Sequence, residues 1–345
     1  MSELGKKPIL GISMGDPNGV GPEIILKTFR DPRMLDDCTP VVFGSAEAFE
    51  HYRELYKWKT FKYERIESLS EISKTKLNLL EVCHDFKEIS PGANTEEAGR
   101  ASFQSLRAAV EALKNQEVDA LITAPINKHN IQSEEFSFPG HTEFLAAAAE
   151  QSEALMLLVH QNLRVGMVTG HVPLKEVSDH ITAERIRSRL RMMEQSMRDD
   201  FNISHPKIAV LGLNPHAGDR GLLGKEEREL IEPLLAEMQE NGHHFFGPFA
   251  ADGFFGSGGF RNFDAILAMY HDQALAPFKA LAFNRGVNFT AGLPFVRTSP
   301  DHGTGYDIAG RGIAKEGSFR EAVFCALDVL RSRKSLQLKE EEEIS

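Results

Sequence analysis

The sequence is poor in cysteine, with only Cys38, Cys83 and Cys325 among its 345 residues. These three are isolated and odd in number, and their spacing matches neither a zinc site nor a redox pair. We therefore expect no disulfide framework, and a reducing cytoplasm is the simplest compartment for the chain.

Long apolar runs and an excess of basic residues are also absent. No segment approaches the ~18 residues needed to span a bilayer, and the polar segment Met1–Pro8 has no apolar stretch that would mark export. The net charge of −11 argues against nucleic acid or a membrane surface as partner, because both select basic faces. We expect a soluble, cytoplasmic protein, in which an anionic small substrate would need a local basic pocket.

Two nucleotide-binding motifs are missing as well. The segment Gly15–Gly21 is rich in glycine, but it fits neither the Walker spacing nor the dinucleotide fingerprint Gly-x-Gly-x-x-Gly. Its backbone amides could hold an anion at the start of the helix that follows. We interpret the segment instead as a structural turn.

What the sequence does have is an alternation of strand and helix patterns, typical of βα units and a mainly parallel sheet. With 345 residues, 41% of them hydrophobic, the chain exceeds what one core usually serves, so two domains are expected. No linker is visible, which allows the chain to cross between domains more than once. The expected strands lie at residues 9–13, 40–44 and 120–124, and the expected helices at residues 95–116, 143–149, 183–199, 225–240 and 318–332. Residues 288–312 are rich in glycine and expected to be loop, and residues 339–345 are expected to be a solvated tail.

Three apolar runs in the second half of the chain each end at a histidine, at His171, His216 and His271. Short apolar runs bounded by Gly and Pro predict buried parallel strands, whose carboxyl ends carry the ligand-binding loops of open α/β folds. Three neutral imidazoles at one such edge predict a catalytic metal site with open positions. Surface or core histidines remain the alternative, since thirteen are scattered through the chain and sequence spacing says nothing about distance.

The densest polar segment, His271–Gly312, mixes charged side chains with glycines, which let the backbone approach a ligand closely. Within it, Lys279 and Arg297 are candidates for holding a phosphate or a carboxylate. A second polar segment, Gly140–Phe144, predicts a helix start in which Thr142 caps the helix and His141 faces a ligand. Solvated surface charge would explain several of these residues equally well.

Several segments, in this order, resemble the 4-hydroxythreonine-4-phosphate dehydrogenase family of pyridoxal phosphate biosynthesis. The matching segments are Gly15–Glu23, Gly140–Phe144, Leu213–Gly218 with Gly224–Glu227, Met269–Gln273, Gly292–Ser299 and Asp301–Thr304. They extend from the first expected strand to the vicinity of the last helix.

The resemblance implies that His171, His216 and His271 bind one divalent ion, such as zinc, magnesium or cobalt. It also implies a homodimer whose active site lies at the subunit interface, with two of these ligands from one chain and the third, His271, from its partner. The implied substrate contacts are His141, Thr142, Lys279, Asn288 and Arg297.

The implied fold is similar to that of isocitrate and isopropylmalate dehydrogenases, with two α/β/α domains and mainly parallel sheets. NAD or NADP is expected in a cleft that is not built on the Rossmann fingerprint, and no residue is assigned to it. We place the first domain at residues 1–135 plus 302–345 and the second at residues 136–301, with the active site in the cleft between them.

The implied reaction is the metal-assisted oxidation of 4-phosphohydroxy-L-threonine. The ion lowers the pKa of the secondary hydroxyl, a base removes its proton, and hydride leaves for nicotinamide. The 3-oxo acid then loses CO2 to give 3-amino-2-oxopropyl phosphate. Lys279 and a water molecule at the ion are the candidate bases, and His141 is a further catalytic candidate.

The substrate stays open, because Asn18 and Ala124 stand where many members of the family have alanine and glycine. Dehydrogenases of 4-phospho-D-erythronate, D-threonate 4-phosphate or a related diol are the alternatives on the same scaffold. A metal-dependent hydrolase would also use three histidines and anion-holding arginines, but no His-Glu-x-x-His pair occurs. A metabolite-binding protein without turnover would leave the metal ligands unexplained.

Overall fold

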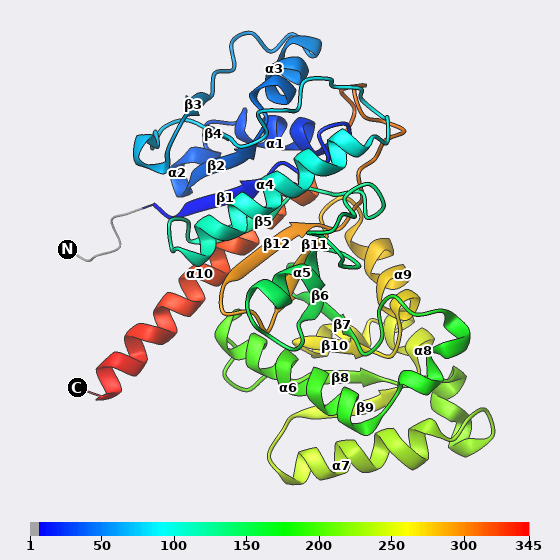
Figure 1. Cartoon of the computed structure of the whole chain (residues 1–345). Coiled ribbons are helices and arrows are strands. Elements are labelled where there is room, and N and C mark those ends of the chain that lie inside the picture. Colours follow the sequence, from blue (N-terminus) through cyan, green and yellow to red (C-terminus); the bar gives the residue numbers. More distant parts are fainter. Residues whose placement is uncertain (1–6, 345) are drawn as a thin grey trace. The chain divides into compact units, whose positions relative to one another are not determined.

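The computed structural model describes residues 7–344, and the chain divides into two compact units (Figure 1). Unit 1 comprises the chain up to Glu153 together with Leu293–Leu330, and unit 2 comprises Ala154–Gly292 and the chain from Arg331 onward. The chain thus crosses between the units more than once. The boundaries predicted after residues 135 and 301 differ from these, because helix α5 (His141–Ala148) stays with unit 1 and the chain re-enters that unit at Leu293.

Unit 1 contains a parallel sheet with the strand order β3-β4-β2-β1-β5-β12. Its strands are β1 (Ile9–Ser13), β2 (Thr39–Gly44), β3 (Glu64–Ile66), β4 (Asn78–Glu81), β5 (Ala120–Thr123) and β12 (Val296–Pro300). Every residue of β2, β5 and β12 is buried, as expected of parallel strands that are covered on both faces. The predicted strands over residues 9–13, 40–44 and 120–124 are confirmed.

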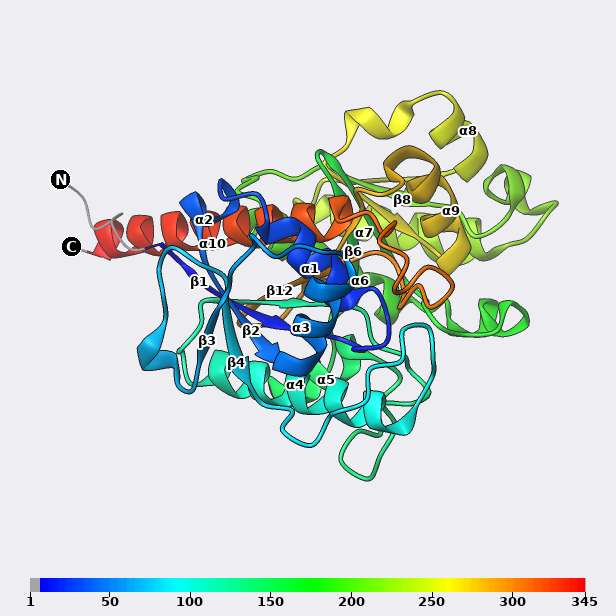
Figure 2. The ribbon, with the colours of Figure 1, turned by 90° about the horizontal axis from the view of Figure 1, so that it is seen from above.

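The helices of unit 1 cover both faces of this sheet. They are α1 (Gly21–Phe29), α2 (Met34–Asp37), α3 (Ala46–Leu55), α4 (Glu96–Lys114), α5 and the first part of α10 (Gly317–Ile344), with a short helical turn η1 (Leu69–Glu71). Figure 2 shows α4 along one face, with α1 and the first part of α10 along the other. Helix α4 begins after Thr95, whose hydroxyl accepts the N–H of Ala98 as an N-cap. Helix α1 has Pro22 in its first turn, where the missing N–H is not needed.

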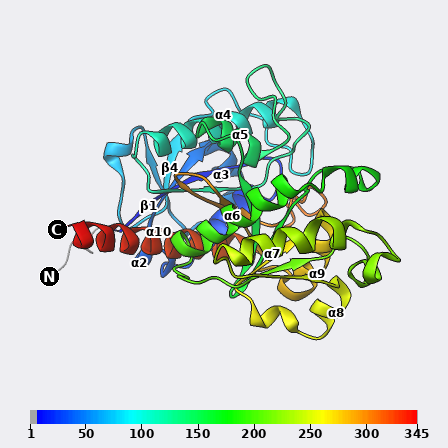
Figure 3. The same cartoon turned by 90° about the horizontal axis from the view of Figure 1, so that it is seen from below.

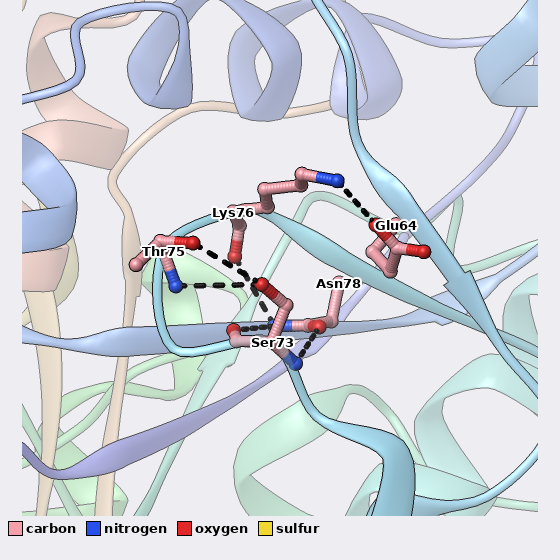
Figure 4. Close-up of polar contacts among 5 residues, drawn as sticks. All are labelled: Glu64, Ser73, Thr75, Lys76 and Asn78. Atoms are coloured by element: carbon pink, nitrogen blue, oxygen red, sulfur yellow. Dashed lines mark hydrogen bonds and ion pairs between the residues drawn. The ribbon is translucent and has the colours of Figure 1, made fainter.

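Polar contacts fix the end of this sheet at β3 and β4 (Figure 4). The buried amide of Asn78 accepts the N–H of Ser73 at 2.7 Å and donates to the carbonyls of Ser73 and Pro40 at 2.9 and 3.1 Å. Lys76 pairs with Glu64 of β3 at 2.6 Å. The turn between the two strands is therefore held to β2 by one side chain.

Unit 2 contains a mixed sheet with the strand order β11-β6-β7-β10-β8-β9. Its strands are β6 (Leu155–His160), β7 (Leu163–Met167), β8 (Ile208–Leu211), β9 (Phe245–Phe249), β10 (Ala265–Ala268) and β11 (Val287–Ala291). Strand β6 runs antiparallel to both β11 and β7, whereas β7, β10, β8 and β9 are parallel. The parallel part carries the three histidines.

Helices also cover both faces of the second sheet (Figure 3). They are α6 (Ala183–Asp199), α7 (Glu232–Glu240), α8 (Ala251–Gly256) and α9 (His271–Ala282), with short helical turns η2 (Leu174–Glu176), η3 (Ser178–His180), η4 (Pro215–Gly221), η5 (Glu227–Ile231) and η6 (Gly259–Asn262). Strand β7 shows the alternation: Val165 and Met167 pack with Phe278 of α9, whereas a Cβ added at Gly166 would meet Met193 of α6. Helix α6 has the predicted bounds.

Two expectations about loops were wrong. The stretch over residues 288–312 contains most of β11 and all of β12, because nearly every residue of these two strands is buried in the sheet despite the polar side chains among them. The last helix continues to Ile344 rather than ending near residue 332, since residues 333–344 are mostly strong helix formers such as Leu, Lys and Glu.

The polar segment predicted at Met1–Pro8 falls mostly on residues 1–6, which lie outside the described residues. None of the helices within residues 7–344 combines the length and the hydropathy that a membrane span requires.

We predict that two Gly→Ala substitutions in helices will have opposite effects. Alanine normally gains about 1 kcal/mol over glycine inside a helix, and Gly253 of α8 has open space where a Cβ would go. At Gly99 of α4 the added Cβ would collide with the backbone carbonyl of Asn130, a clash that costs about 1–3 kcal/mol or more. In thermal unfolding, Gly253→Ala should therefore raise Tm or leave it unchanged, whereas Gly99→Ala should lower it by several degrees. Equal Tm shifts for the two variants would contradict the packing described for α4.

Candidate active site

The three predicted metal ligands all follow strands of the parallel part of unit 2. His171 lies four residues after the end of β7 at Met167, and His216 follows β8 in the turn η4. His271 is the first residue of α9, three residues after the end of β10 at Ala268. Because β10 lies between β7 and β8, these segments leave the same edge of the sheet. The expected placement at strand ends is confirmed.

Two of the imidazoles lie side by side. The ring centroids of His171 and His271 are 5.9 Å apart. A nitrogen–zinc distance of about 2.0–2.1 Å puts two imidazole centroids on one ion roughly 5–6 Å apart, so this pair fits a shared cation. Nδ1 of His271 contacts a carboxylate oxygen of Asp272 at 2.7 Å, an arrangement that orients a ligating ring and leaves Nε2 for the metal.

His216 is not grouped with that pair. Among residues 7–344, no three His, Cys, Asp or Glu side chains are placed so that one chain could hold a metal by itself. The pair within the chain is His171 and His271, whereas the resemblance expects His171 and His216 from one chain. Which ring the partner would supply therefore stays a prediction.

Unit 1 places a second group of candidate residues around a buried guanidinium. Arg297 on β12 is 2% exposed, and it donates from Nη2 and Nε to the hydroxyl of Thr123 on the neighbouring strand β5, at 2.6 and 3.2 Å. Burial lowers the pKa of Arg297 to about 9, and the charge of Glu143 acts in the opposite direction. The guanidinium thus stays charged at neutral pH in surroundings that an anionic ligand would complement.

His141 contributes an unsatisfied nitrogen to the same group. Its Nε2 atom is buried and has no hydrogen-bond partner among the described residues. Burial above all, and then the charges of Arg297 and Lys128, hold the pKa of His141 well below its usual range, so the ring is neutral at pH 7. A neutral Nε2 can donate to or accept from a ligand, depending on the tautomer.

Aromatic packing holds the helix that carries His141. Phe144 of α5 packs against Phe136 and against Phe103 of α4, with ring centroids 5.3 and 6.0 Å apart. The predicted capping role of Thr142 was wrong, because α5 begins at His141 and Gly140 is its N-cap, with no side-chain cap. Thr142 lies inside the first turn, where its own N–H is one of the groups that a cap would satisfy.

Lys128 also belongs to this group, although no role was predicted for it from the sequence. Its Nζ atom lies 3.9 Å from the position that a Cβ on Gly140 would occupy, and its charge acts on His141. The available signal was its place in a loop at the carboxyl end of strand β5. Two cations, Arg297 and Lys128, together with the neutral ring of His141, make up the group that we call the cationic cluster.

The two remaining predicted substrate contacts lie in unit 2. Lys279 is exposed on α9, eight residues and therefore about 12 Å along the helix from His271. Asn288 lies on β11, paired with Leu158 of β6, and its buried Oδ1 has no hydrogen-bond partner among the described residues. Asn288, like His141, therefore has a buried polar atom with no hydrogen-bond partner among the described residues.

The glycine-rich segment Gly15–Gly21 is a structural turn, as interpreted from its spacing. A Cβ at Gly15 or Gly21 would collide with the carbonyl of Pro125 or Met14. The buried amide of Asn18 accepts the N–H of Ser90 and donates to the carbonyl of Ala93. Through these contacts the segment joins loops of unit 1, and its side chains are buried within the protein.

Comparison with known proteins identifies the family. A family model described as "Pyridoxal phosphate biosynthetic protein PdxA" matches residues 36–326. A 4-hydroxythreonine-4-phosphate dehydrogenase from Bacteroides thetaiotaomicron is 49% identical over 325 residues, which cover 94% of this chain and 89% of that protein. The chain belongs to the PdxA family.

The structure agrees with this membership. The crystal structure of a 4-hydroxythreonine-4-phosphate dehydrogenase from Klebsiella pneumoniae is similar with a TM-score of 0.82 at 34% identity, covering 95% of this chain and 99% of that one. The protein is therefore an oxidoreductase and not a hydrolase. The PdxA-family relatives also include one from Oceanobacillus iheyensis named "Putative D-threonate 4-phosphate dehydrogenase", 38% identical and covering 94% of this chain and 99% of that protein.

The neutral state of His141, whose Nε2 atom is buried, predicts a pH dependence of stability. Its folded-state pKa is lowered, so below about pH 6.5, the ordinary histidine pKa, the unfolded chain binds a proton that the folded chain excludes. Stability should consequently fall as the pH drops below that value, by up to about 1.4 kcal/mol per pH unit from this residue. His141→Gln should reduce the loss between pH 7.5 and 5.5 by about 1 kcal/mol, measured by denaturant unfolding. His129→Gln, which replaces an exposed imidazole in the same unit, is the matched control, and identical pH profiles for His141→Gln and the native chain would refute the assignment.

Proposed function

We propose that the protein is a 4-hydroxythreonine-4-phosphate dehydrogenase of pyridoxal phosphate biosynthesis. It oxidises the secondary hydroxyl of 4-phosphohydroxy-L-threonine with NAD or NADP, in the presence of a divalent cation, to a 3-oxo acid. Loss of CO2 from that acid yields 3-amino-2-oxopropyl phosphate. The observation that carries the proposal is the cationic cluster of unit 1, in a family whose named relatives act on a phosphorylated hydroxy acid.

The cationic cluster of unit 1 is the group proposed to hold the anionic part of the substrate. Arg297 offers a planar fork already fixed by Thr123, and a fork of this kind binds phosphate or carboxylate oxygens in pairs. Lys128 adds a compact positive charge, and the neutral ring of His141 adds one directed contact. Because Arg297 is buried, a bound anion interacts with it at low dielectric, where the attraction is stronger than in water.

The histidines of unit 2 are the group proposed to hold the divalent cation. Neutral imidazoles are suited to zinc and to other divalent first-row metals, and the spacing of His171 and His271 fits a shared ion. When bound, the cation would supply charge stabilisation at the alcohol oxygen, and the nicotinamide would accept the hydride. The chain's own part is to hold the substrate's hydroxyl at the imidazoles and to receive the hydroxyl proton, through Lys279 or through water.

A homodimer with a shared active site is part of this proposal. Within residues 7–344 the chain does not gather three metal ligands by itself, so a second copy would complete the set. Leu174 lies three residues after His171 and Leu222 lies six residues after His216, and these side chains are 75% and 78% exposed. Apolar side chains exposed beside two ligand segments suit a surface that a second copy would cover.

The second candidate is oxidation of D-threonate 4-phosphate or 4-phospho-D-erythronate. It is favoured by the relative from Oceanobacillus iheyensis. These compounds share the phosphate and the secondary hydroxyl with 4-phosphohydroxy-L-threonine, and they carry a hydroxyl where the latter has an amine. The cationic cluster would bind the phosphate of either substrate. The choice between them therefore depends on which protein group contacts the amine or hydroxyl at C2 of the substrate.

The activity is tested by following nicotinamide reduction with purified protein, NAD or NADP, a divalent metal and each of the three phosphorylated acids. We expect turnover with 4-phosphohydroxy-L-threonine, and a loss of about a hundred-fold or more in kcat/KM for His171→Ala and His216→Ala, since each removes a ligand. His205→Ala, which removes an exposed imidazole from the same unit, should retain activity. Turnover only with D-threonate 4-phosphate or 4-phospho-D-erythronate would favour the second candidate. Full activity in the metal-stripped protein would refute the metal assignment.

The anion-holding role of Arg297 is tested by Arg297→Lys. The substitution keeps the charge but exchanges a fork for a point charge, and losing a charge-assisted hydrogen bond costs about 1.5–3 kcal/mol. We expect KM for the phosphorylated substrate to rise by roughly ten-fold to a hundred-fold, with a smaller effect on kcat. Arg100→Lys, at an exposed arginine on α4, controls for the loss of a guanidinium. An unchanged KM in Arg297→Lys would exclude the role.

A further inference from the structure

Hydrogen bonds join the segment of His171 to the segment of His271. Thr169, two residues before His171, donates its backbone N–H and its hydroxyl to the carbonyl of Met269, at 3.1 and 2.8 Å. Met269 lies two residues before His271. Both Thr169 and Met269 are buried, so this connection is shielded from water and the two segments leave the sheet in a fixed relation.

A single side chain joins the segment of His271 to that of His216. Oε1 of Gln273 accepts the N–H of Met269 at 2.7 Å, and Nε2 of Gln273 donates to the carbonyl of Gly212 at 2.7 Å. Gly212 lies four residues before His216. The backbone pairing of β10 with β8 reaches only Leu267 and Val210, so Gln273 bridges these two segments beyond the end of their ladder.

Close packing couples the position of Gly212 to that of His216. A Cβ at Gly212 would lie 3.1 Å from Cα of Ala217, the residue after His216. The turn itself has an unusual shape, since His216–Arg220 all have φ between 42° and 77°, a left-handed conformation that costs non-glycine residues about 1–3 kcal/mol each. A turn of this kind persists only where its surroundings fix it.

Glu227, the first residue of the next helical turn η5, holds this conformation in place. Its carboxylate is 1% exposed and accepts both the N–H and the side-chain amide of Asn214, at 2.7 and 3.0 Å. The same carboxylate packs against Gly218, where a Cβ would collide with Oε2. Hydrogen bonds and close packing therefore join the turn η4 to Gly212 and Glu227.

From these contacts we infer that Gln273, together with Thr169, is a positioning residue that sets the separation of the three histidine-bearing strand ends. Gln273 holds Met269 and Gly212, Thr169 holds Met269, and the packing of Gly212 carries the constraint to His216. The inference rests on the proposed role of these histidines as metal ligands. It adds to that role the groups that fix each histidine segment within one chain, and therefore the ligands that each chain presents to an ion shared with its partner.

The test compares Gln273→Glu with the native chain in the full-length protein. The carboxylate keeps the acceptor for the N–H of Met269 but replaces the donor to Gly212 with an oxygen that repels its carbonyl. Zn²⁺ affinity is measured by competition with a chromophoric chelator, the ligand field by the visible spectrum of the Co²⁺ form, and stability by Tm of the metal-free protein. Gln239→Glu is the matched control, because Gln239 donates to the carbonyl of Phe245 in the same unit and joins segments that carry none of the three histidines.

We expect Gln273→Glu to weaken Zn²⁺ binding by about ten-fold to a hundred-fold and to change the Co²⁺ spectrum. Gln239→Glu should leave both at the native values while lowering the metal-free Tm by a similar amount. Native affinity and spectrum in Gln273→Glu would overturn the inference while leaving the proposed function intact. No Zn²⁺ binding by the native chain, or no weakening in His171→Ala, would overturn the metal assignment and this inference with it.

A second pair of variants covers the case in which Gln273→Glu does not fold. Thr169→Val removes the hydroxyl donated to Met269 at nearly constant shape, whereas Thr169→Ser retains it. Zn²⁺ affinity should fall in Thr169→Val and be largely restored in Thr169→Ser. Equal affinities for the two variants would contradict the positioning role, since loss of packing alone would affect Thr169→Ser as well.

Discussion

The parallel pairing of β7, β10 and β8 is the constraint on which the candidate metal site depends. Parallel neighbours end at the same edge, so one sheet edge receives three chain segments that are far apart in sequence, each of which carries a histidine. Pairing alone does not set the distances between the imidazoles, because the ladder stops before the histidines are reached. Side-chain hydrogen bonds and packing at Thr169, Gln273 and Glu227 determine the rest.

In unit 1, the candidate residues surround a single buried charge, the guanidinium of Arg297. Arg297 is brought into the sheet by β12, and its contact with Thr123 ties it to β5. The lowered pKa of Arg297 shows that the penalty of burial outweighs the favourable charge of Glu143. The same charge helps to keep His141 neutral. The charged guanidinium of Arg297 and the neutral imidazole of His141 therefore belong to the same group, and each keeps one protonation state at neutral pH.

The sequence predicted what depends on periodicity and strand order, and it missed what depends on contacts. Alternation of strand and helix patterns gave the α/β architecture, and the three runs that end in histidine gave the strand-end placement. Strands β11 and β12 were missed because glycine and polar residues within 288–312 outweighed a short alternating pattern. Thr142 was given a capping role because the cap Gly140 has no side chain to indicate it. The role of Gln273 has no sequence signal of its own, since its two partners are backbone groups of segments about sixty residues apart.

The unsatisfied atoms connect stability with the proposed function. Nε2 of His141 and Oδ1 of Asn288 are buried without a hydrogen-bond partner among the described residues, and each such atom costs about 1–3 kcal/mol. A residue that leaves a polar atom unsatisfied in the folded protein gains that interaction only when a ligand supplies the partner. Ligand binding then stabilises the folded chain through mass action, and it does so most for ligands whose polar groups match these atoms. Under the proposed function, the cost carried by the free protein would also be a source of selectivity, because an analogue that lacks the matching group would leave the same atoms unsatisfied.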